Sequence, residues 1–231
     1  MANEPNRNTT NPPAPIYPTQ PTTVILPRPA DLQPIHTENL ILQPFNLDSE
    51  PALNSDAAKF FLFRSRPDVA AWLRSKTPDS TPSETKSWMK AKIFNTPDGS
   101  GAINSRHFFF SIVPKSSPGT IIGGVGINSL SPAPSVGYAL HPDFWGKGYA
   151  TEAVRGVVEA WWGLPRVPVE HTNGDGNRRG EERLFAATQR ENIGSRKVLS
   201  KVGFEVYEFA EYQGATIAVM CISKKGLYDQ S

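Results

Sequence analysis

The stretch Leu140-His141-Pro142-Asp143-Phe144-Trp145-Gly146-Lys147-Gly148-Tyr149-Ala150-Thr151 decides how this chain is organised. It follows an apolar segment, Val136 to Leu140, that indicates a β-strand, and it runs through a loop that carries two glycines. It ends in the most strongly periodic helical pattern of the chain, whose apolar residues recur at steps of three and four: Ala150, Ala153, Val154, Val157, Val158 and Trp161. The sequence therefore predicts a strand, a loop and an amphipathic helix in direct succession.

This succession is typical of an anion site, because the first backbone N–H groups of a helix have no partner within the helix. Gly146 and Gly148 favour such a site, since a side chain at either position would keep a phosphate away from those groups. A turn that only reverses the chain would explain the same glycines. Gly123, Gly124 and Gly126 precede no helix, so we expect them to mark a bulge or close packing within a strand.

Short strands and helices are predicted on both sides of this unit. The expected strands are Leu40 to Leu42, His107 to Val113, Thr120 to Ile127, Val136 to Leu140, Leu184 to Thr188, Phe204 to Tyr212 and Ala215 to Ser223. The expected helices, besides the one after Gly148, are Asn54 to Arg64, Pro67 to Ser75, Ser83 to Phe94, and Asn192 to Val202 with Gly203 at a left-handed C-terminal position. Strands that precede the main helix in a meander indicate an α+β domain.

Two segments lie outside this pattern. Residues 1 to 34 are dense in proline and poor in apolar side chains, so we expect a disordered tail that acts as a linker or, less favoured, docks a partner. The domain then spans residues 35 to 231. Within it, residues 164 to 182 combine prolines, glycines and charges, and we expect an exposed insertion loop there.

Composition excludes several classes of protein. Lys and Arg number 24 against 22 Asp and Glu, and a formal net charge of +2 is too small for a dedicated nucleic-acid binder. The single cysteine, Cys221, allows no internal disulfide and no cysteine-rich metal site, so we expect no metal. Apolar runs are too short for a transmembrane helix or a signal peptide, and we expect a cytoplasmic protein that does not bind membranes.

Further motifs accompany the central stretch in a fixed order: Thr37-Glu38, Gly137-Tyr138-Ala139-Leu140, Asn192-Ile193-Gly194-Ser195 and Lys201-Val202-Gly203-Phe204. With them the chain resembles the GCN5-related N-acetyltransferases (GNAT), most closely the ribosomal-protein and N-terminal amine acetyltransferases, over roughly residues 36 to 223. The resemblance implies a mixed, mostly antiparallel sheet of six or seven strands with flanking helices. It also implies acetyl-coenzyme A as cosubstrate and an amine as acceptor.

The resemblance implies roles for individual residues. The strand Tyr138, Ala139 and Leu140 would separate from its neighbour and bind the pantetheine arm, with a backbone N–H near Leu140 stabilising the oxyanion. Asn192 would hydrogen-bond the cofactor arm, cap the following helix, or do both. The pyrophosphate would be held by Gly146, Lys147, Gly148, Tyr149, Ala150 and Thr151. Arg196, Lys197 and Lys201 could contact a coenzyme A phosphate. We favour the alternative that they form a solvated helix face.

The usual catalytic acid and base are missing. Ser135 and Ala187 stand where relatives place an acidic residue, and Leu199 stands where many place a tyrosine. Ser195 is the candidate for stabilising or protonating the leaving thiolate, with helix capping as the alternative. His141 has a suitable intrinsic pKa for a base, but we favour a structural role for it. Glu152 is a further carboxylate near the site, but its position at a helix N-terminus is explained by the helix dipole and a solvated face rather than by catalysis.

The missing base favours an acceptor of low basicity. An α-amino group has a pKa of about 7.7 to 8.0 and a lysine amine one near 10.4, so only the first is substantially neutral at pH 7. We therefore hypothesise that the acceptor is a peptide or protein N-terminus, or a small amine. Acetylation of an antibiotic or polyamine, and a catalytically silent acyl-coenzyme A-binding module, are the alternatives. The sequence is compatible with a homodimer and leaves the oligomeric state open.

Overall fold

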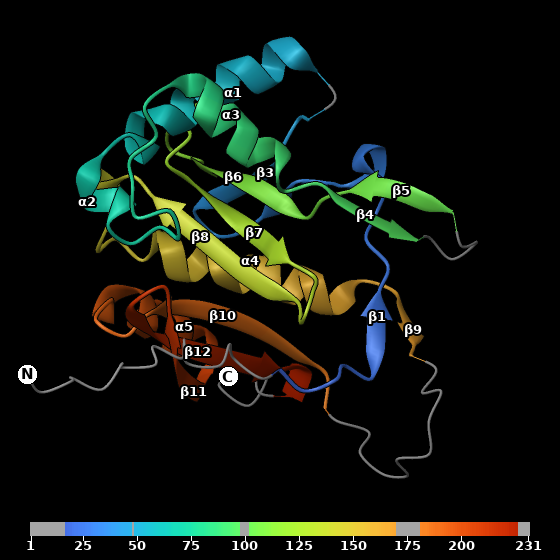
Figure 1. The fold of residues 1–231 in the computed structure, drawn as a ribbon. Helices are drawn as coiled ribbons and strands as arrows, with labels where there is room; N and C mark the ends of the chain where they lie inside the picture. Colours follow the sequence, from blue (N-terminus) through green and yellow to red (C-terminus); the bar gives the residue numbers. More distant parts are fainter. Residues whose placement is uncertain (1–16, 48, 98–101, 170–180, 226–231) are drawn as a thin grey trace, which may run out of the picture.

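The computed structural model describes residues 17–47, 49–97, 102–169 and 181–225, and an eight-stranded sheet dominates them (Figure 1). Its strands lie in the order β11-β12-β10-β8-β7-β6-β3-β2, and β8 and β10 are its one parallel pair. Their bounds are β2 Ile35–His36, β3 Leu40–Pro44, β6 Phe109–Pro114, β7 Gly123–Ser129, β8 Ser135–Leu140, β10 Arg183–Gln189, β11 Glu205–Tyr212 and β12 Ala215–Ser223.

The predicted mixed, mostly antiparallel sheet in an α+β domain is thus confirmed, with one strand more than the six or seven expected. The additional edge strand β2 has two residues, which is too short to produce a recognisable alternation of side chains. Two further strand pairs lie outside the main sheet among the described residues: β1 (Thr22–Val24) with β9 (Arg166–Pro168), and β4 (Phe94–Pro97) with β5 (Ile103–Arg106).

Helices cover both faces of the sheet. The helices are α1 Glu50–Arg64, α2 Pro67–Ala70, α3 Pro82–Lys90, α4 Tyr149–Gly163 and α5 Ile193–Val202, with single 3-10 turns η1 Pro29–Asp31 and η2 Pro142–Phe144. Figure 1 shows α1 and α3 on one face and α4 on the other. Two predicted helices are shorter than expected: α2 ends at Ala70, and α3 ends at Lys90, before β4 begins at Phe94.

Apolar clusters pack on both faces of the sheet. On the α1 side, Phe60 packs with Phe45 and Phe109, and on the α4 side Trp161 packs among the strands. Glycines in β7 allow this close packing. A Cβ on Gly124 would lie 2.8 Å from a ring carbon of Phe60, and one on Gly126 would lie 2.4 Å from the carbonyl oxygen of Phe108. Close packing, as expected from the sequence, therefore explains these glycines.

The expectation of a disordered tail up to residue 34 is wrong for residues 17–34, whereas residues 1–16 lie outside the described part. Tyr17 packs edge-on against Phe185, with ring centroids 5.0 Å apart. Leu26 is 2% exposed and joins the core on the α4 side. The apolar triplet Val24-Ile25-Leu26 between prolines carried this signal. Val24 ends β1, which pairs with β9, and the Ile25 N–H donates to the carbonyl oxygen of Pro165.

The expected insertion loop is also partly ordered. Arg166, at the start of β9, forms a salt bridge with Glu182 at 2.8 Å. Its guanidinium also donates to the carbonyl oxygens of Trp161, Trp162 and Leu164, which satisfies acceptors at the end of α4. Segment 170–180 of the predicted loop lies outside the described residues.

Glu152 does not occupy a solvated face, as the sequence suggested, but ties α4 to the turn between β2 and β3. Its Oε1 accepts hydrogen bonds from the Thr37 hydroxyl at 2.5 Å and from the Asn39 backbone N–H at 2.6 Å. Burial raises the pKa of the Glu152 carboxyl, but the hydrogen bonds from Thr37 and Asn39 outweigh burial and hold this pKa below its ordinary value. The ionised form is therefore the one that stabilises the fold.

We expect Glu152→Gln to lower the free energy of unfolding by about 1 kcal/mol at pH 7, because it weakens these hydrogen bonds. Since the pKa is lowered in the folded state, the contribution of Glu152 is present above the ordinary carboxyl pKa and is lost as the pH falls through the folded pKa. Urea unfolding at pH 7 and below pH 4 measures this. The matched control is Glu159→Gln, on the exposed side of the same helix. A difference from wild type that does not shrink in acid would contradict the assignment.

Among the described residues, no helix combines the length and apolar character that a membrane crossing requires.

Candidate active site

The candidate site begins where β8 and β10 separate. Their one paired position joins Ser135 to Phe185, and the Phe185 N–H donates to the carbonyl oxygen of Pro134 at 2.9 Å. Beyond this point the strands run on toward Leu140 and Gln189 without further pairing. The backbone edge of β8 that faces β10 is therefore left open over its last residues.

The register of β8 shows which of its groups face this opening. The His141 N–H donates to the carbonyl oxygen of Ile122, so His141 belongs to a hydrogen-bonded pair with the strand on the other side. In an antiparallel ladder such pairs alternate with pairs whose N–H and C=O groups point outward. Leu140 and Tyr138, which oppose Gly123 and Val125, are outward-pointing positions. Their N–H groups point toward β10, as a strand that binds an extended ligand requires.

The loop after β8 and the start of α4 form the predicted anion site. Gly146 and the N-cap residue Gly148 have φ of 73° and 84°, in the left-handed region that favours glycine. The first helical hydrogen bond runs from the Glu152 N–H to the carbonyl oxygen of Gly148. The N–H groups of Tyr149, Ala150 and Thr151 precede it, so the helix itself offers them no acceptor.

Space beside these N–H groups is also available. A Cβ built on Gly146 or Gly148 would meet no atom within 4 Å. The glycines are therefore not required for packing within the protein, in contrast to those of β7. Left-handed backbone, free helix donors and open space together fit a diphosphate.

Trp145 and His141 hold this loop in place. The Trp145 indole N–H donates to the carbonyl oxygen of Leu140 at 2.9 Å, which ties the loop to the end of β8. The His141 Nδ1 accepts the Asp143 N–H at 3.2 Å and so caps η2. The structural interpretation of His141 agrees with this geometry. The contact of Trp145 could not be predicted, because it depends on how the loop folds back.

Asn192 is the N-cap of α5, and Ser195 lies in the first turn of this helix. The Asn192 Oδ1 accepts the Ser195 N–H at 2.9 Å, so Asn192 is the helix cap. The Ser195 side chain contacts strand β8. Its Oγ lies 2.7 Å from the Tyr138 hydroxyl oxygen, and that hydroxyl also approaches the Ser195 carbonyl oxygen at 3.1 Å.

This contact links β8 to α5. Burial raises the pKa of Tyr138 to about 12, although the hydrogen bond to Ser195 opposes the increase. The phenol therefore keeps its proton at neutral pH and can serve as a hydrogen-bond donor. Sequence reasoning considered only the backbone of Tyr138, because a side-chain pair between a strand and a distant helix follows from tertiary packing alone.

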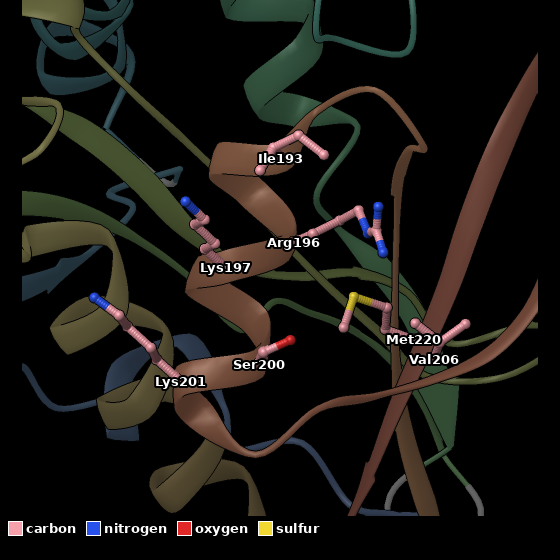
Figure 2. A pocket seen from close by; sticks show the side chains of 7 residues that line it. All are labelled: Ile193, Arg196, Lys197, Ser200, Lys201, Val206 and Met220. Atoms are coloured by element: carbon pink, nitrogen blue, oxygen red, sulfur yellow. The ribbon is translucent and has the colours of Figure 1, made fainter.

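The basic residues of α5 point in two directions. A hollow of about 700 Å³ between α5 and strands β11 and β12 is lined by Ile193, Arg196, Lys197, Ser200, Lys201, Val206 and Met220. Figure 2 shows Arg196 directed toward Met220 and Val206, whereas Lys197 and Lys201 project from another side of α5. Lys201 also contacts α4, because the Arg155 guanidinium donates to its carbonyl oxygen at 2.6 Å. The helix thus has two distinct basic sides.

The structure shows the surroundings of the three residues that replace the usual acid and base. Leu199 is 1% exposed and belongs to the core on the α4 side. Ala187 is exposed on β10, and Ser135 lies at the paired start of β8. Within the described ranges, no group of three or more His, Cys, Asp or Glu side chains is arranged to hold a metal ion.

A family model for the acetyltransferase (GNAT) domain matches residues 46–205. The chain belongs to this family. It is therefore an acetyl-coenzyme A-dependent acyltransferase, and the separated strands and the loop before α4 are found where the resemblance in sequence implied them. No curated protein matches the chain in sequence.

Solved structures of acetyltransferases share the fold. A GNAT-family acetyltransferase from Bacillus anthracis is similar with a TM-score of 0.60 at 15% identity, over 84% of this chain and 99% of that one. Ribosomal-protein-S5-alanine acetyltransferase from Vibrio fischeri is similar with a TM-score of 0.53 at 19% identity, over 86% and 99%. The ribosomal L7/L12 alpha-N-protein acetyltransferase RimL, in complex with coenzyme A, gives 0.53 at 16% identity, over 83% and 98%.

Proposed function

We propose that this GNAT protein acetylates the α-amino group of a peptide or protein N-terminus. The observation that carries the proposal is Ala187, a small exposed residue at the position where relatives place a carboxylate base. An acceptor that is largely neutral at pH 7 needs such a base least. Two of the similar structures are described as acetyltransferases of ribosomal-protein N-termini or alanine, which agrees with this acceptor class.

The proposal gives acetyl-coenzyme A a defined set of contacts. The N–H groups of Tyr149, Ala150 and Thr151, with Gly146, Lys147 and Gly148 in the loop, would hold the pyrophosphate. The outward-pointing backbone of Tyr138 and Leu140 would bind the pantetheine arm, beside Ala139. Asn192 uses its Oδ1 for the cap, so its amide N–H groups are left to donate to that arm.

In the proposed reaction, the neutral amine attacks the thioester carbonyl, a C–N bond forms and the C–S bond breaks. The Leu140 N–H would stabilise the negative charge on the carbonyl oxygen. The Tyr138 N–H, two residues earlier on the strand, is too far away to share this role. The amine releases its proton to water. The leaving thiolate would be stabilised or protonated by Ser195, whose hydroxyl is oriented by the protonated Tyr138.

Matched peptides test the acceptor class. A peptide with a free α-amine and no lysine should have a kcat/KM at pH 7 that exceeds, by about two orders of magnitude, the value for an N-terminally blocked peptide with one lysine, because of its neutral fraction. The advantage should shrink at pH 9.5. A clear preference for lysine would overturn the proposal. Coenzyme A binding without coenzyme A release on any amine would favour the silent binding module.

Ser195→Ala tests the role of the hydroxyl. We expect kcat to fall by about tenfold or more, with little change in the KM for acetyl-coenzyme A, since the Asn192 cap uses the backbone N–H of residue 195 and survives the substitution. Steady-state kinetics measure both constants. Ser200→Ala, on an exposed position of the same helix, is the control. An unchanged kcat would exclude Ser195 from the thiolate step.

A further inference from the structure

A β-bulge in β11 determines where the Glu208 side chain points. Val206 opposes Met220, and the register then shifts so that Glu208 opposes Val219. Tyr207 is the additional residue of the bulge. Without it, residue 208 would oppose Ala218 and face the same side as Met220, toward α5. Bulges commonly re-aim a side chain in this way next to functional sites.

The side to which Glu208 turns is the one opposite α5. Val219 packs there with Phe185 and Ala133, and Tyr17 contacts the same cluster. The core between the sheet and α5 contains a different set of side chains, among them Leu199 and Met220. Glu208 therefore lies on the face of β10, β12 and β11 that Tyr17, rather than α5, partly covers.

Glu208 is in one row with the position of the missing base. Ala187 opposes Val219, and Val219 opposes Glu208, so the three residues lie side by side across three strands. The parallel pairing of Ser135 with Phe185 sets Ala187 level with Gly137, next to the opening beside β8. Two strand spacings separate the backbones of Ala187 and Glu208, or about 10 Å.

One oxygen of the Glu208 carboxylate lacks a hydrogen-bond donor within the described ranges. This oxygen, Oε1, is buried. The nearby Arg74 guanidinium contacts another residue of β11: it lies over the Tyr212 ring and donates to the Tyr212 hydroxyl. Burial, and after it the Glu208 charge, raises the pKa of the neighbouring Tyr17 phenol. A buried carboxylate oxygen without a donor is costly, and a cation that supplies N–H groups would remove this cost.

We propose that Glu208 binds a basic side chain at the second residue of the acceptor peptide, which makes it a specificity determinant. This inference rests on the proposed acetylation of N-terminal amines. With the α-amine beside Ala187, one peptide unit of about 3.8 Å and the four-carbon stem of a lysine bring an ammonium group within reach of Glu208. A lysine several residues further along the peptide is not held at this distance from the α-amine, so we do not expect it to bind Glu208 in the same way.

Three peptides that begin with serine and are equal in length test this inference: one has lysine at position two, one glutamine at position two, and one glutamine at position two with lysine at position five. For the wild-type protein we expect the KM for the first to be about tenfold lower than for the others, as a charge-assisted hydrogen bond would give. Glu208→Gln should abolish this difference and leave the KM for acetyl-coenzyme A and kcat on the glutamine peptide unchanged. Glu211→Gln, on the same strand but exposed and bonded to Thr216, should keep the difference.

Each outcome separates the two proposals. Turnover of all three peptides with equal KM, or a preference that persists in Glu208→Gln, overturns the role of Glu208 and leaves the proposed function intact. No turnover of any peptide, while small amines are acetylated, overturns the proposed function itself. If Glu208→Gln does not fold, the wild-type protein still tests the inference, because equal KM values for the three peptides would exclude a preference for lysine at position two.

Discussion

Gly148→Glu is expected to reduce the affinity for coenzyme A by about 100-fold or more, equivalent to ~2.8 kcal/mol. The carboxylate would project into the open space beside the first N–H groups of α4, where the pyrophosphate is proposed to bind. Bulk and charge repulsion both oppose the ligand there. The readout is the increase in Tm on adding coenzyme A, which should disappear.

The left-handed backbone of Gly148 requires a matched control. A non-glycine residue at φ of 84° costs about 1–2 kcal/mol, so Gly148→Glu should also be less stable. Gly214, in the turn between β11 and β12, has φ of 74° and equally open surroundings. Gly214→Glu should lose similar stability and still be stabilised by coenzyme A. An unchanged coenzyme A response in Gly148→Glu would contradict the proposed pyrophosphate site.

Phe60→Ala is expected to lower the free energy of unfolding by about 3–5 kcal/mol, a large share of the total for a domain of this size. Phe60 is fully buried and packs against Phe45, Phe63 and Trp88, with ring centroids 5.3–5.7 Å apart. It also fills the space above Gly124. Substitution would leave a cavity between α1 and the sheet.

Leu62 provides the comparison within the same helix. Its side chain is 66% exposed, so Leu62→Ala should change the free energy of unfolding by less than about 0.5 kcal/mol. Urea unfolding monitored by circular dichroism measures both variants. Equal losses would show that α1 does not pack on the sheet through Phe60.

Local patterns made the central unit of this protein predictable. The strand that ends at Leu140, the loop with Gly146 and Gly148, and the periodic helix that follows lie within one short segment, and their bonds are mostly local. The left-handed Gly203 after α5 was predictable for the same reason: its φ is 109°, and the Phe204 N–H bonds the carbonyl oxygen of Leu199.

Elements that depend on distant partners were predicted poorly. Thr22–Val24 forms a strand only because Arg166–Pro168 lies beside it, and neither segment has a strong pattern of its own. Glu152 appeared solvated because its partners, Thr37 and Asn39, precede it by more than a hundred residues. A helical wheel cannot show such partners.

By itself, the sequence determined the family, the order of elements around the central glycine loop, and the backbone donors that suit a diphosphate. Only the tertiary structure decided which side chains meet at the opening between β8 and β10, including the pairing of Tyr138 with Ser195 and the row that joins Ala187 to Glu208. The reason is physical: backbone conformation and capping follow from neighbouring residues, whereas side-chain contacts across a sheet depend on strand register, and a single bulge reverses the face to which a residue points.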